Sequence, residues 1–243
     1  MQPGELPNLG SQTAYYNKRW SGFDFANQFG QERSIFILES ILATGIERPR
    51  MCDLGSGPGW LTSILSAFGP AVGVELSDRA VELARDRYPS AEFICADVLN
   101  WMWSGPPFDI VVSQEVVEHV PDQQAYVRIA HGLLKPNGFP ILTTPNPHVL
   151  RAIPEPDRAP WILQPIENWL TRKDLIALLR GKFRVLHASS RVLGIGSRGV
   201  HRFVNSPKLR YAFSKLRLDS AWDGFRRRFG YGMYHVIFAQ RSD

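Results

Sequence analysis

The feature that most constrains the fold is a regular alternation of strand-like and helix-like segments from about residue 31 onward. Buried strands are predicted over residues 50–54, 71–76, 91–96, 108–113, 139–144, 183–188 and 233–240. Helices are predicted around residues 35–42 and over residues 60–68, 78–88, 123–134 and 172–181. This alternation is typical of a sheet with helices on both faces. We therefore expect one α/β domain over residues 1–243, doubly wound around a mostly parallel seven-stranded sheet.

Local signals mark the ends of several elements. The run "LLKPNGF" ends a helix near residue 134, because Asn137 and Gly138 tolerate the left-handed conformation that stops it. Thr171 and Asp174 resemble a capping box at the start of the helix that follows. The proline-rich segment 145–165 is predicted to be an irregular loop at the carboxyl edge of the sheet, where such folds bind ligands.

Composition restricts the class of protein. With 44% hydrophobic residues, 243 residues can bury the core of one domain. The apolar runs are shorter than the roughly 20 residues that span a bilayer, and the first residues show no signal-peptide pattern. Cys52 and Cys95 both fall in predicted buried strands and do not form a disulfide framework. We therefore expect a cytoplasmic protein with reduced thiols.

The net charge of +5 is unevenly distributed. Between Arg191 and Arg228 there are ten Lys/Arg and two Asp, a net charge of +8, so the rest of the chain carries −3. We expect residues 188–230 to form a basic insertion before the last strand. Such a segment suits phosphate, nucleic acid or a lipid surface, and the alternative is a solvated face that keeps the protein soluble.

The stretch "CDLGSGPGW", residues 52–60, joins a predicted strand to a predicted helix. Gly55, Gly57 and Gly59 would let the backbone approach a ligand closely, and the helix N-terminus favours a negative group. Their spacing is one residue tighter than the dinucleotide pattern, which argues against a pyrophosphate ligand. A tight strand-to-helix connection is the alternative explanation.

Two acids follow at the ends of predicted strands. Glu75 ends the second strand, where a carboxylate can accept hydrogen bonds from two ribose hydroxyls. Asp97 ends the third strand, where a carboxylate can accept an amino N–H of adenine. The two positions together favour a nucleoside ligand.

At these residues the sequence resembles the class I S-adenosylmethionine-dependent methyltransferases. The segments "DLGSGPG", "GVELS", "CADV", "PFDIVVSQEVVEHV" and "LLKPNGFPILTTPNP" carry the resemblance, which is strong over about residues 50–147. It implies a Rossmann-like methyltransferase fold and S-adenosylmethionine as cofactor, with Glu75 at the ribose and Asp97 at the adenine amino group. It further implies adenine contacts at Leu76 and Val98, and methionine contacts at Asp53, Gly55, Ser56, Gly57, Gly59 and Gln114.

The run "EVVEHV" places Glu115, Glu118 and His119 within one turn if the segment is helical. Their oxygen and nitrogen donors suit a divalent cation such as Mg, Mn or Zn, which would acidify an acceptor hydroxyl. Two other interpretations stay open. His119 caps a helix while Glu118 packs structurally, or His119 is a direct general base.

This run resembles two branches of the family, the ubiquinone-pathway catechol O-methyltransferases and the small-RNA ribose 2′-O-methyltransferases. The RNA branch has a further histidine before its later helix, whereas this chain has Gln164, Pro165, Ile166 and Glu167 there. We therefore expect an O-methyltransferase that acts on a hydroxyl of a small-molecule, sugar or lipid-linked acceptor, with His119 and Glu118 as catalytic residues.

The alternatives are an RNA ribose 2′-O-methyltransferase and a catalytically silent cofactor-binding partner protein. An anionic acceptor would suit the basic insertion, which could also contact a membrane peripherally, and nucleic acid is the less favoured partner. At the N-terminus, residues 1–30 are predicted to form an aromatic lid in which Tyr15, Tyr16 and Trp20 cover the cofactor or bind substrate. The alternative is that these aromatic residues are a plain hydrophobic anchor.

Overall fold

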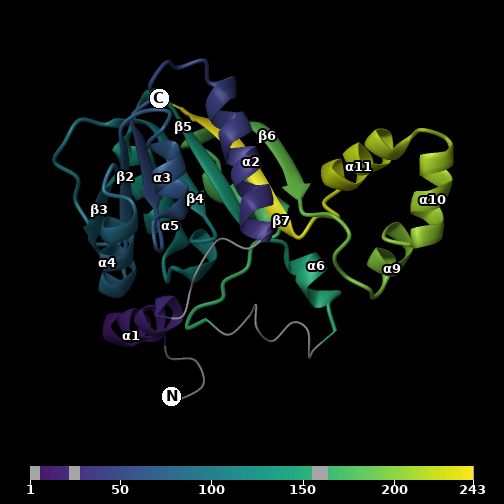
Figure 1. The fold of residues 1–243 in the computed structure, drawn as a ribbon, viewed down its shortest axis with the longest axis horizontal. Coiled ribbons are helices and arrows are strands. Elements are labelled where there is room, and N and C mark those ends of the chain that lie inside the picture. The colour runs from purple at the N-terminus through teal and green to yellow at the C-terminus, as the bar shows by residue number, and fades with distance from the viewer. Residues whose placement is uncertain (1–5, 22–27, 155–163, 243) are drawn as a thin grey trace.

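The computed structural model describes residues 6–21, 28–154 and 164–242, without the side chains of residues 28 and 29. One seven-stranded sheet runs through this part of the chain in the order β3-β2-β1-β4-β5-β7-β6 (Figure 1). Neighbouring strands pair in parallel except at β7, which is antiparallel to β5 and to β6. The predicted doubly wound, mostly parallel sheet is confirmed.

The strands are β1 (Met51–Leu54), β2 (Ala71–Glu75), β3 (Glu92–Cys95), β4 (Phe108–Gln114), β5 (Leu134–Pro145), β6 (Phe183–Arg191) and β7 (Tyr234–Arg241). Within one strand, successive side chains serve opposite faces. Met51 packs in the cluster that includes Ile37 and Leu65, whereas Cys52 packs in the cluster that includes Tyr126 and Leu175. The strands read as continuous apolar runs because both faces of the sheet are covered.

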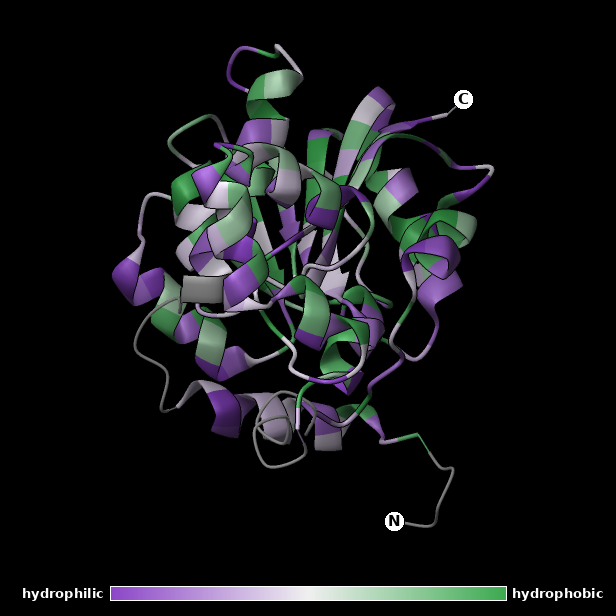
Figure 2. Ribbon diagram, turned by 90° about the vertical axis from the view of Figure 1, so that its right-hand side faces the viewer, coloured by the Kyte–Doolittle hydropathy of each residue, from purple (hydrophilic) through white to green (hydrophobic). Residues whose placement is uncertain are grey.

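The covering helices divide between these two faces. On one face lie α2 (Gln28–Ala43) and α3 (Trp60–Leu65), and on the other lie α5 (Gln123–Leu133) and α8 (Arg172–Leu179). The helix α4 (Asp78–Arg87) packs on β3, and α1 (Leu9–Trp20) lies beside it (Figure 1). Hydrophobic and hydrophilic residues alternate along these helices (Figure 2), as expected for helices with one buried side.

The end of the helix over residues 123–134 agrees with the expectation within one residue, but the start of β5 and the structure of the proline-rich segment differ from it. The helix α5 ends at Leu133, and the residues that follow belong to β5, because Leu134 already pairs with Phe108 of β4. Asn137 does adopt a left-handed conformation, with φ of 60°, but within this strand. The proline-rich segment also contains a short helix, α6 (Pro147–Arg151), which begins where the Asn146 side chain accepts a hydrogen bond from the His148 amide. Residues 155–163 of that segment lie outside the described residues.

The capping box predicted from the sequence is confirmed, whereas the predicted burial of both cysteines is confirmed for Cys52 and wrong for Cys95. The capping box at Thr171 and Asp174 is present, with both reciprocal hydrogen bonds formed. Cys52 is buried as expected, whereas Cys95 is exposed because β3 is an edge strand. None of the described helices is both long and apolar enough to cross a membrane.

Between β6 and β7 the chain forms three short helices, α9 (Val200–Val204), α10 (Pro207–Lys215) and α11 (Asp219–Arg228). They project from the side of the body at the β6 end of the sheet (Figure 1). The predicted insertion at 188–230 starts too early, since β6 continues to Arg191.

Candidate active site

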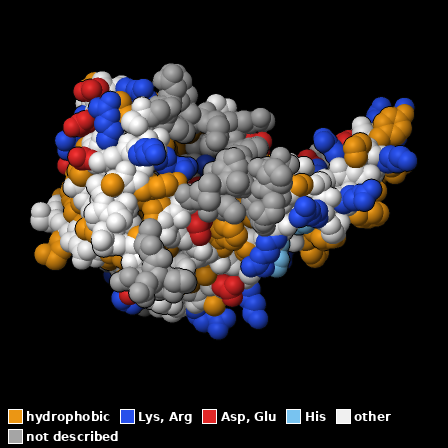
Figure 3. Space-filling model, turned by 90° about the horizontal axis from the view of Figure 1, so that it is seen from below, with side chains coloured by type: hydrophobic (Ala, Val, Ile, Leu, Met, Phe, Trp, Pro, Cys, Tyr) orange, Lys and Arg blue, Asp and Glu red, His pale blue; other side chains and the backbone are white. Residues whose placement is uncertain are grey.

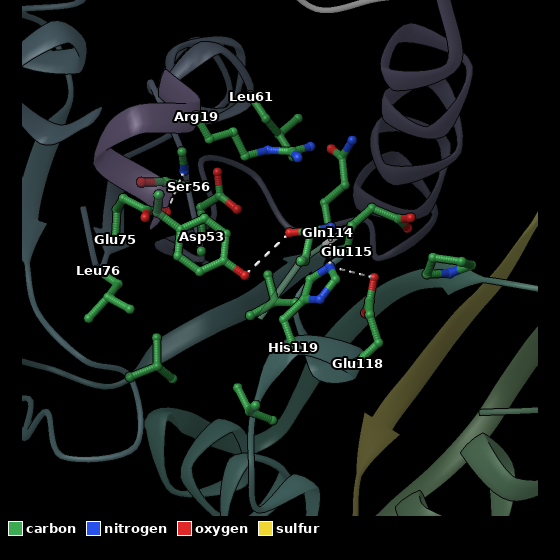
Figure 4. Close-up of a pocket in the computed structure, with 18 of the residues that line it drawn as sticks. Arg19, Asp53, Ser56, Leu61, Glu75, Leu76, Gln114, Glu115, Glu118 and His119 are labelled. Carbon is green, nitrogen blue, oxygen red and sulfur yellow. Dashed lines mark hydrogen bonds and ion pairs between the residues drawn. The ribbon is translucent and has the colours of Figure 1, made fainter. Parts of the chain in front are cut away.

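A cavity of about 320 Å³ opens at the carboxyl edge of the sheet, below the glycine turn (Figure 4). Its lining includes all but one of the site residues predicted from the sequence: Asp53, Gly55, Ser56, Gly57, Glu75, Leu76, Asp97, Val98, Gln114, Glu115, Glu118 and His119. The exception is Gly59. The carboxyl ends of parallel strands meet at one edge, which explains how residues so far apart in sequence converge.

The glycine turn is left-handed at each of its glycines, with φ of 76° at Gly55, 52° at Gly57 and 83° at Gly59. A Cβ on Gly55 would lie 2.3 Å from a methyl of Val116, so this position admits no side chain. A Cβ on Gly59 would lie 2.6 Å from the Phe93 ring. Gly59 therefore serves helix packing at the start of α3 rather than the cavity surface.

Glu75 is buried and holds the glycine turn in place. Its two carboxylate oxygens accept hydrogen bonds from the amides of Gly57 and Ser77, each at 2.9 Å. Burial raises the pKa of this carboxyl, and the two amide donors oppose the rise. The predicted ribose-holding residue thus couples the end of β2 to the turn that follows β1.

Asp53 and Asp97 present two further carboxylates to the cavity. Asp53 accepts a hydrogen bond from the Thr62 hydroxyl at 2.7 Å, and burial raises its pKa to about 7. Asp97 accepts hydrogen bonds from the Leu99 amide at 3.0 Å and the Asn100 side chain at 2.5 Å. These local bonds orient Asp97 towards the cavity from the turn after β3.

The acid and histidine run does not form a helical turn, which corrects the expectation. Glu115 has a left-handed φ of 60°, and only Val117–His119 form a short 3-10 helix, η1. The left-handed residue turns the chain between Glu115 and Glu118, so helical spacing does not bring their side chains together. They line the same cavity because the sheet edge and η1 both border it.

Two neighbouring threonines of β5 hold the two glutamates. Thr143 donates to Glu115 at 2.8 Å, and Thr144 donates to Glu118 at 3.0 Å. Burial raises the pKa of each carboxyl to about 8. The guanidinium of Arg33 lies 3.9 Å from Glu115 and opposes the rise there.

His119 is bonded at both ring nitrogens. Nδ1 lies 2.8 Å from the Ile166 carbonyl, and Nε2 lies 2.9 Å from the side-chain nitrogen of Gln164. A carbonyl only accepts, so Nδ1 carries the proton and Nε2 presents its lone pair to the amide. Burial lowers the pKa of the imidazole. His119 is therefore neutral at pH 7, with a basic nitrogen at the cavity wall.

Gln164 stands in the segment where the RNA branch is expected to place its further histidine, and it also connects the site to the N-terminal helix. The Tyr16 hydroxyl of α1 donates to its side-chain oxygen at 3.3 Å. Tyr16 and Trp20 line the cavity, in the manner of the predicted aromatic lid, whereas Tyr15 does not. Residues 1–5 and 22–27 of the predicted lid lie outside the described residues.

The cavity residues that sequence reasoning missed include Arg19, Arg33 and Tyr234. Arg33 lies over the Tyr234 ring, 4.1 Å from its centroid. A signal for Arg33 exists, because it falls in the same helical stripe as Ile37 and Ile41 of α2. A basic residue in an apolar stripe indicates a buried charge with a specific partner. Tyr234 has no local signal, because only the sheet pairing brings it to the cavity.

The described part of the chain contains no group of three His, Cys, Asp or Glu side chains arranged to hold a metal ion. Among the three predicted ligands, Glu118 has an oxygen, Oε1, that is buried without a hydrogen-bond partner. This atom lies 3.5 Å from His119 Nε2. The three predicted ligands thus share a cavity without converging on one point.

Comparison with known proteins relates this site to a family. Residues 52–142 match the model of a methyltransferase domain. The ubiquinone biosynthesis O-methyltransferase of Ruegeria pomeroyi is 30% identical over 159 residues, which cover 56% of this chain and 61% of that protein. The trans-aconitate 2-methyltransferase of Methylobacterium radiotolerans is 31% identical over 123 residues, covering 49% and 47%. The matched region thus spans about half to three-fifths of these curated relatives.

The fold of the chain also resembles that of a solved methyltransferase structure. The solved structure of the N-methyltransferase NodS from Bradyrhizobium japonicum with S-adenosyl-L-homocysteine superposes with a TM-score of 0.63, covering 96% of this chain and all of that one. At 13% identity, this likeness shows the fold alone. The domain match, the relatives and the fold agree with the strand-end acids and the glycine turn. Residues 52–142 therefore match a methyltransferase domain, and the chain has the fold of a solved S-adenosylmethionine-dependent methyltransferase.

Proposed function

We propose that the chain transfers a methyl group from S-adenosylmethionine to a hydroxyl oxygen of a small-molecule, sugar or lipid-linked acceptor. The observation that carries this proposal is the neutral imidazole of His119, whose Nε2 lone pair lies at the cavity wall. A hydroxyl is a weak nucleophile and needs a base, whereas a neutral amine does not. The name of the Ruegeria relative, an O-methyltransferase, gives independent support.

The residues have separate roles in this reaction. When bound, S-adenosylmethionine supplies an electrophilic methyl group, and S-adenosylhomocysteine leaves with the electron pair of the broken C–S bond. His119 Nε2 accepts the hydroxyl proton as the new O–C bond forms, and the Ile166 carbonyl keeps the ring oriented. The glycine turn, Glu75 and Asp97 position the nucleoside, so that proximity supplies much of the rate enhancement.

The acceptor reaches His119 by taking the place of the Gln164 amide at Nε2. That amide now makes the hydrogen bond that an acceptor hydroxyl would make. Arg19 and Arg33 also line the cavity, and their charges suit an acceptor with an anionic group. The proposal therefore includes an anionic or polar acceptor that binds between α1 and η1.

A cation-assisted form of the same reaction, with Mg, Mn or Zn on Glu115, Glu118 and His119, is the second candidate. The unpartnered buried oxygen of Glu118 favours it. Within the described residues these three side chains do not form a cluster arranged to hold a metal ion. Activity measured with EDTA and then with each added cation separates the two forms.

The test is methyl transfer from labelled S-adenosylmethionine to a panel of acceptors: a catechol, a sugar, a lipid-linked alcohol, trans-aconitate, an amine and RNA. We expect a hydroxyl compound to be methylated and His119→Ala to lower kcat by about 10²–10⁴-fold. His187→Ala is the matched control, because this exposed imidazole bonds Ser189 on β6 and does not line the cavity.

Three outcomes would overturn the proposal. Methylation of the amine or carboxylate alone, with His119→Ala unaffected, would assign a different acceptor class. Transfer to RNA that falls steeply with salt would favour the RNA alternative. Binding of S-adenosylhomocysteine without turnover on any acceptor would indicate the catalytically silent partner protein.

A further inference from the structure

Residues 192–232, which we call the arm, contain α9, α10 and α11 and stand apart from the sheet (Figures 1 and 3). No residue of α10 is buried. Its Phe213 stacks on Trp222 of α11, with ring centroids 4.5 Å apart. The helix α11 packs on the sheet, against β6. The arm therefore offers most of its surface to a partner or to solvent.

The arm concentrates exposed apolar side chains. Of thirteen large hydrophobic residues exposed in the described part of the chain, seven lie here: Val200, Phe203, Tyr211, Leu216, Leu218, Phe225 and Phe229. Phe203, Leu216 and Phe229 are 68%, 67% and 62% exposed. Single exposed apolar residues need no explanation, but a cluster of this kind marks an interaction surface.

Basic side chains surround these apolar residues, as Figure 3 shows on one face of the arm. Nine Lys/Arg lie between Arg198 and Arg228, against Asp219 and Asp223. Asp223 pairs with Arg226, the one of the nine that is buried. The other eight are exposed: Arg198, Arg202, Lys208, Arg210, Lys215, Arg217, Arg227 and Arg228.

We propose that the arm docks on an anionic lipid membrane. Its aromatic and aliphatic side chains enter the interfacial layer, and its Lys and Arg side chains contact lipid phosphates. The phosphates of RNA would also attract the basic side chains of the arm. However, Val200, Leu216 and Leu218 are aliphatic and cannot stack on bases. A second copy of the chain would bring two strongly basic arms together, which repel one another.

The arm is attached at the same edge of the sheet as the cavity. It begins after β6 ends at Arg191 and finishes just before Met233 and Tyr234, which line the cavity. A docked arm therefore brings the cavity close to the membrane surface. This placement would give the cavity access to a lipid-linked acceptor, a step that rests on the proposed function. The docking of the arm on a membrane does not depend on that function.

Sedimentation of the full chain with vesicles tests the proposal. We expect binding to vesicles of phosphatidylcholine mixed with phosphatidylglycerol, little binding to phosphatidylcholine alone, and weaker binding as salt increases. Each basic residue near an anionic surface contributes about fivefold to the partition coefficient, so Lys208→Gln with Arg210→Gln should lower it by about 25-fold. Leu216→Ser with Phe229→Ser should lower it at least about tenfold at low salt.

The matched control is Arg79→Gln with Arg128→Gln, which removes the same charge from exposed helices of the body and should leave binding within about twofold. Equal losses of vesicle binding in the control variant and the arm variants would overturn the proposal. So would salt-sensitive binding to single-stranded RNA without vesicle binding. Binding of S-adenosylhomocysteine should be unchanged in the arm variants, which separates this test from that of the proposed function.

Discussion

The substitution Glu118→Gln should stabilise the cofactor-free protein at alkaline pH. Glu118 is fully buried, one of its oxygens has no hydrogen-bond partner, and burial raises its pKa from 4.5 to about 8. In the unfolded chain the carboxyl ionises near its ordinary value. The folded state therefore binds more protons between these two pKa values, and stability falls as pH rises through this window.

The full shift corresponds to about 5 kcal/mol, since each pKa unit equals about 1.4 kcal/mol. A glutamine keeps the side-chain shape and accepts the Thr144 hydroxyl bond, but it cannot ionise. After local relaxation we expect a gain of about 2–4 kcal/mol at pH 9 and less than about 1 kcal/mol at pH 5.

Urea denaturation at both pH values, in EDTA, measures the difference. Glu82→Gln is the control, because that side chain is 63% exposed. A gain for Glu118→Gln that is equal at pH 5 and pH 9 would refute the reasoning, as would a loss at pH 9. If Mg or Mn stabilises the parent protein at pH 9 but not the variant, Glu118 holds a cation, which supports the second candidate mechanism.

Three further predictions follow from the site. Gly59→Ala should cost about 2–4 kcal/mol of folding stability in urea, because φ is 83° and a Cβ would lie 2.6 Å from a phenyl carbon of β3. Gly45→Ala, with φ of 68° and open space, should cost only about 1 kcal/mol, and equal costs would contradict the packing argument. Gln164→Leu removes the amide that donates to the His119 lone pair and so stabilises the neutral imidazole. The pKa of His119 should therefore rise, and the acid limb of the pH profile of kcat/KM should move to higher pH. A loss of kcat/KM that is equal at every pH would show that Gln164 has only a structural role. Glu75→Gln should weaken S-adenosylhomocysteine binding at least about tenfold by calorimetry, and an unchanged Kd would remove Glu75 from the cofactor site.

The strands were predictable because each is a short apolar run bounded by Gly, Pro or polar residues. Their ends were not, since pairing with a neighbouring strand decides them. Leu134 belongs to β5 because it pairs with Phe108, a contact between residues far apart in sequence. The helix α6 did have a local signal, an Asn146 N-cap followed by Pro147 at the first turn, which the many prolines of that segment obscured.

The candidate site also has parts that local sequence patterns predict and parts that depend on contacts between distant residues. Strand-end acids and the glycine turn are local patterns, and the structure brings them to one cavity. The contacts of His119 are not local, because Ile166 and Gln164 come from a segment more than forty residues away. The left-handed turn at Glu115 was also hidden, since a non-glycine residue rarely adopts it and no sequence signal marks it.

The buried acids of the cavity imply that cofactor binding releases protons. Burial raises the pKa of Asp53 to about 7, so near neutral pH this carboxyl is about half protonated. The family resemblance places the methionine part beside it, and the positive ammonium and sulfonium groups favour its ionised form. Binding at pH 7 should therefore release up to about half a proton from Asp53.

Calorimetry in buffers of different ionisation enthalpy measures this release. S-adenosylmethionine should release more protons than S-adenosylhomocysteine, because only the former carries the sulfonium charge. Asp53→Asn should lower the release for both ligands, whereas Asp78→Asn, an exposed substitution at the start of α4, should not. Binding with no proton release at pH 7 would show that the ligand does not change the ionisation of these acids, and the electrostatic account of the cavity would then be wrong.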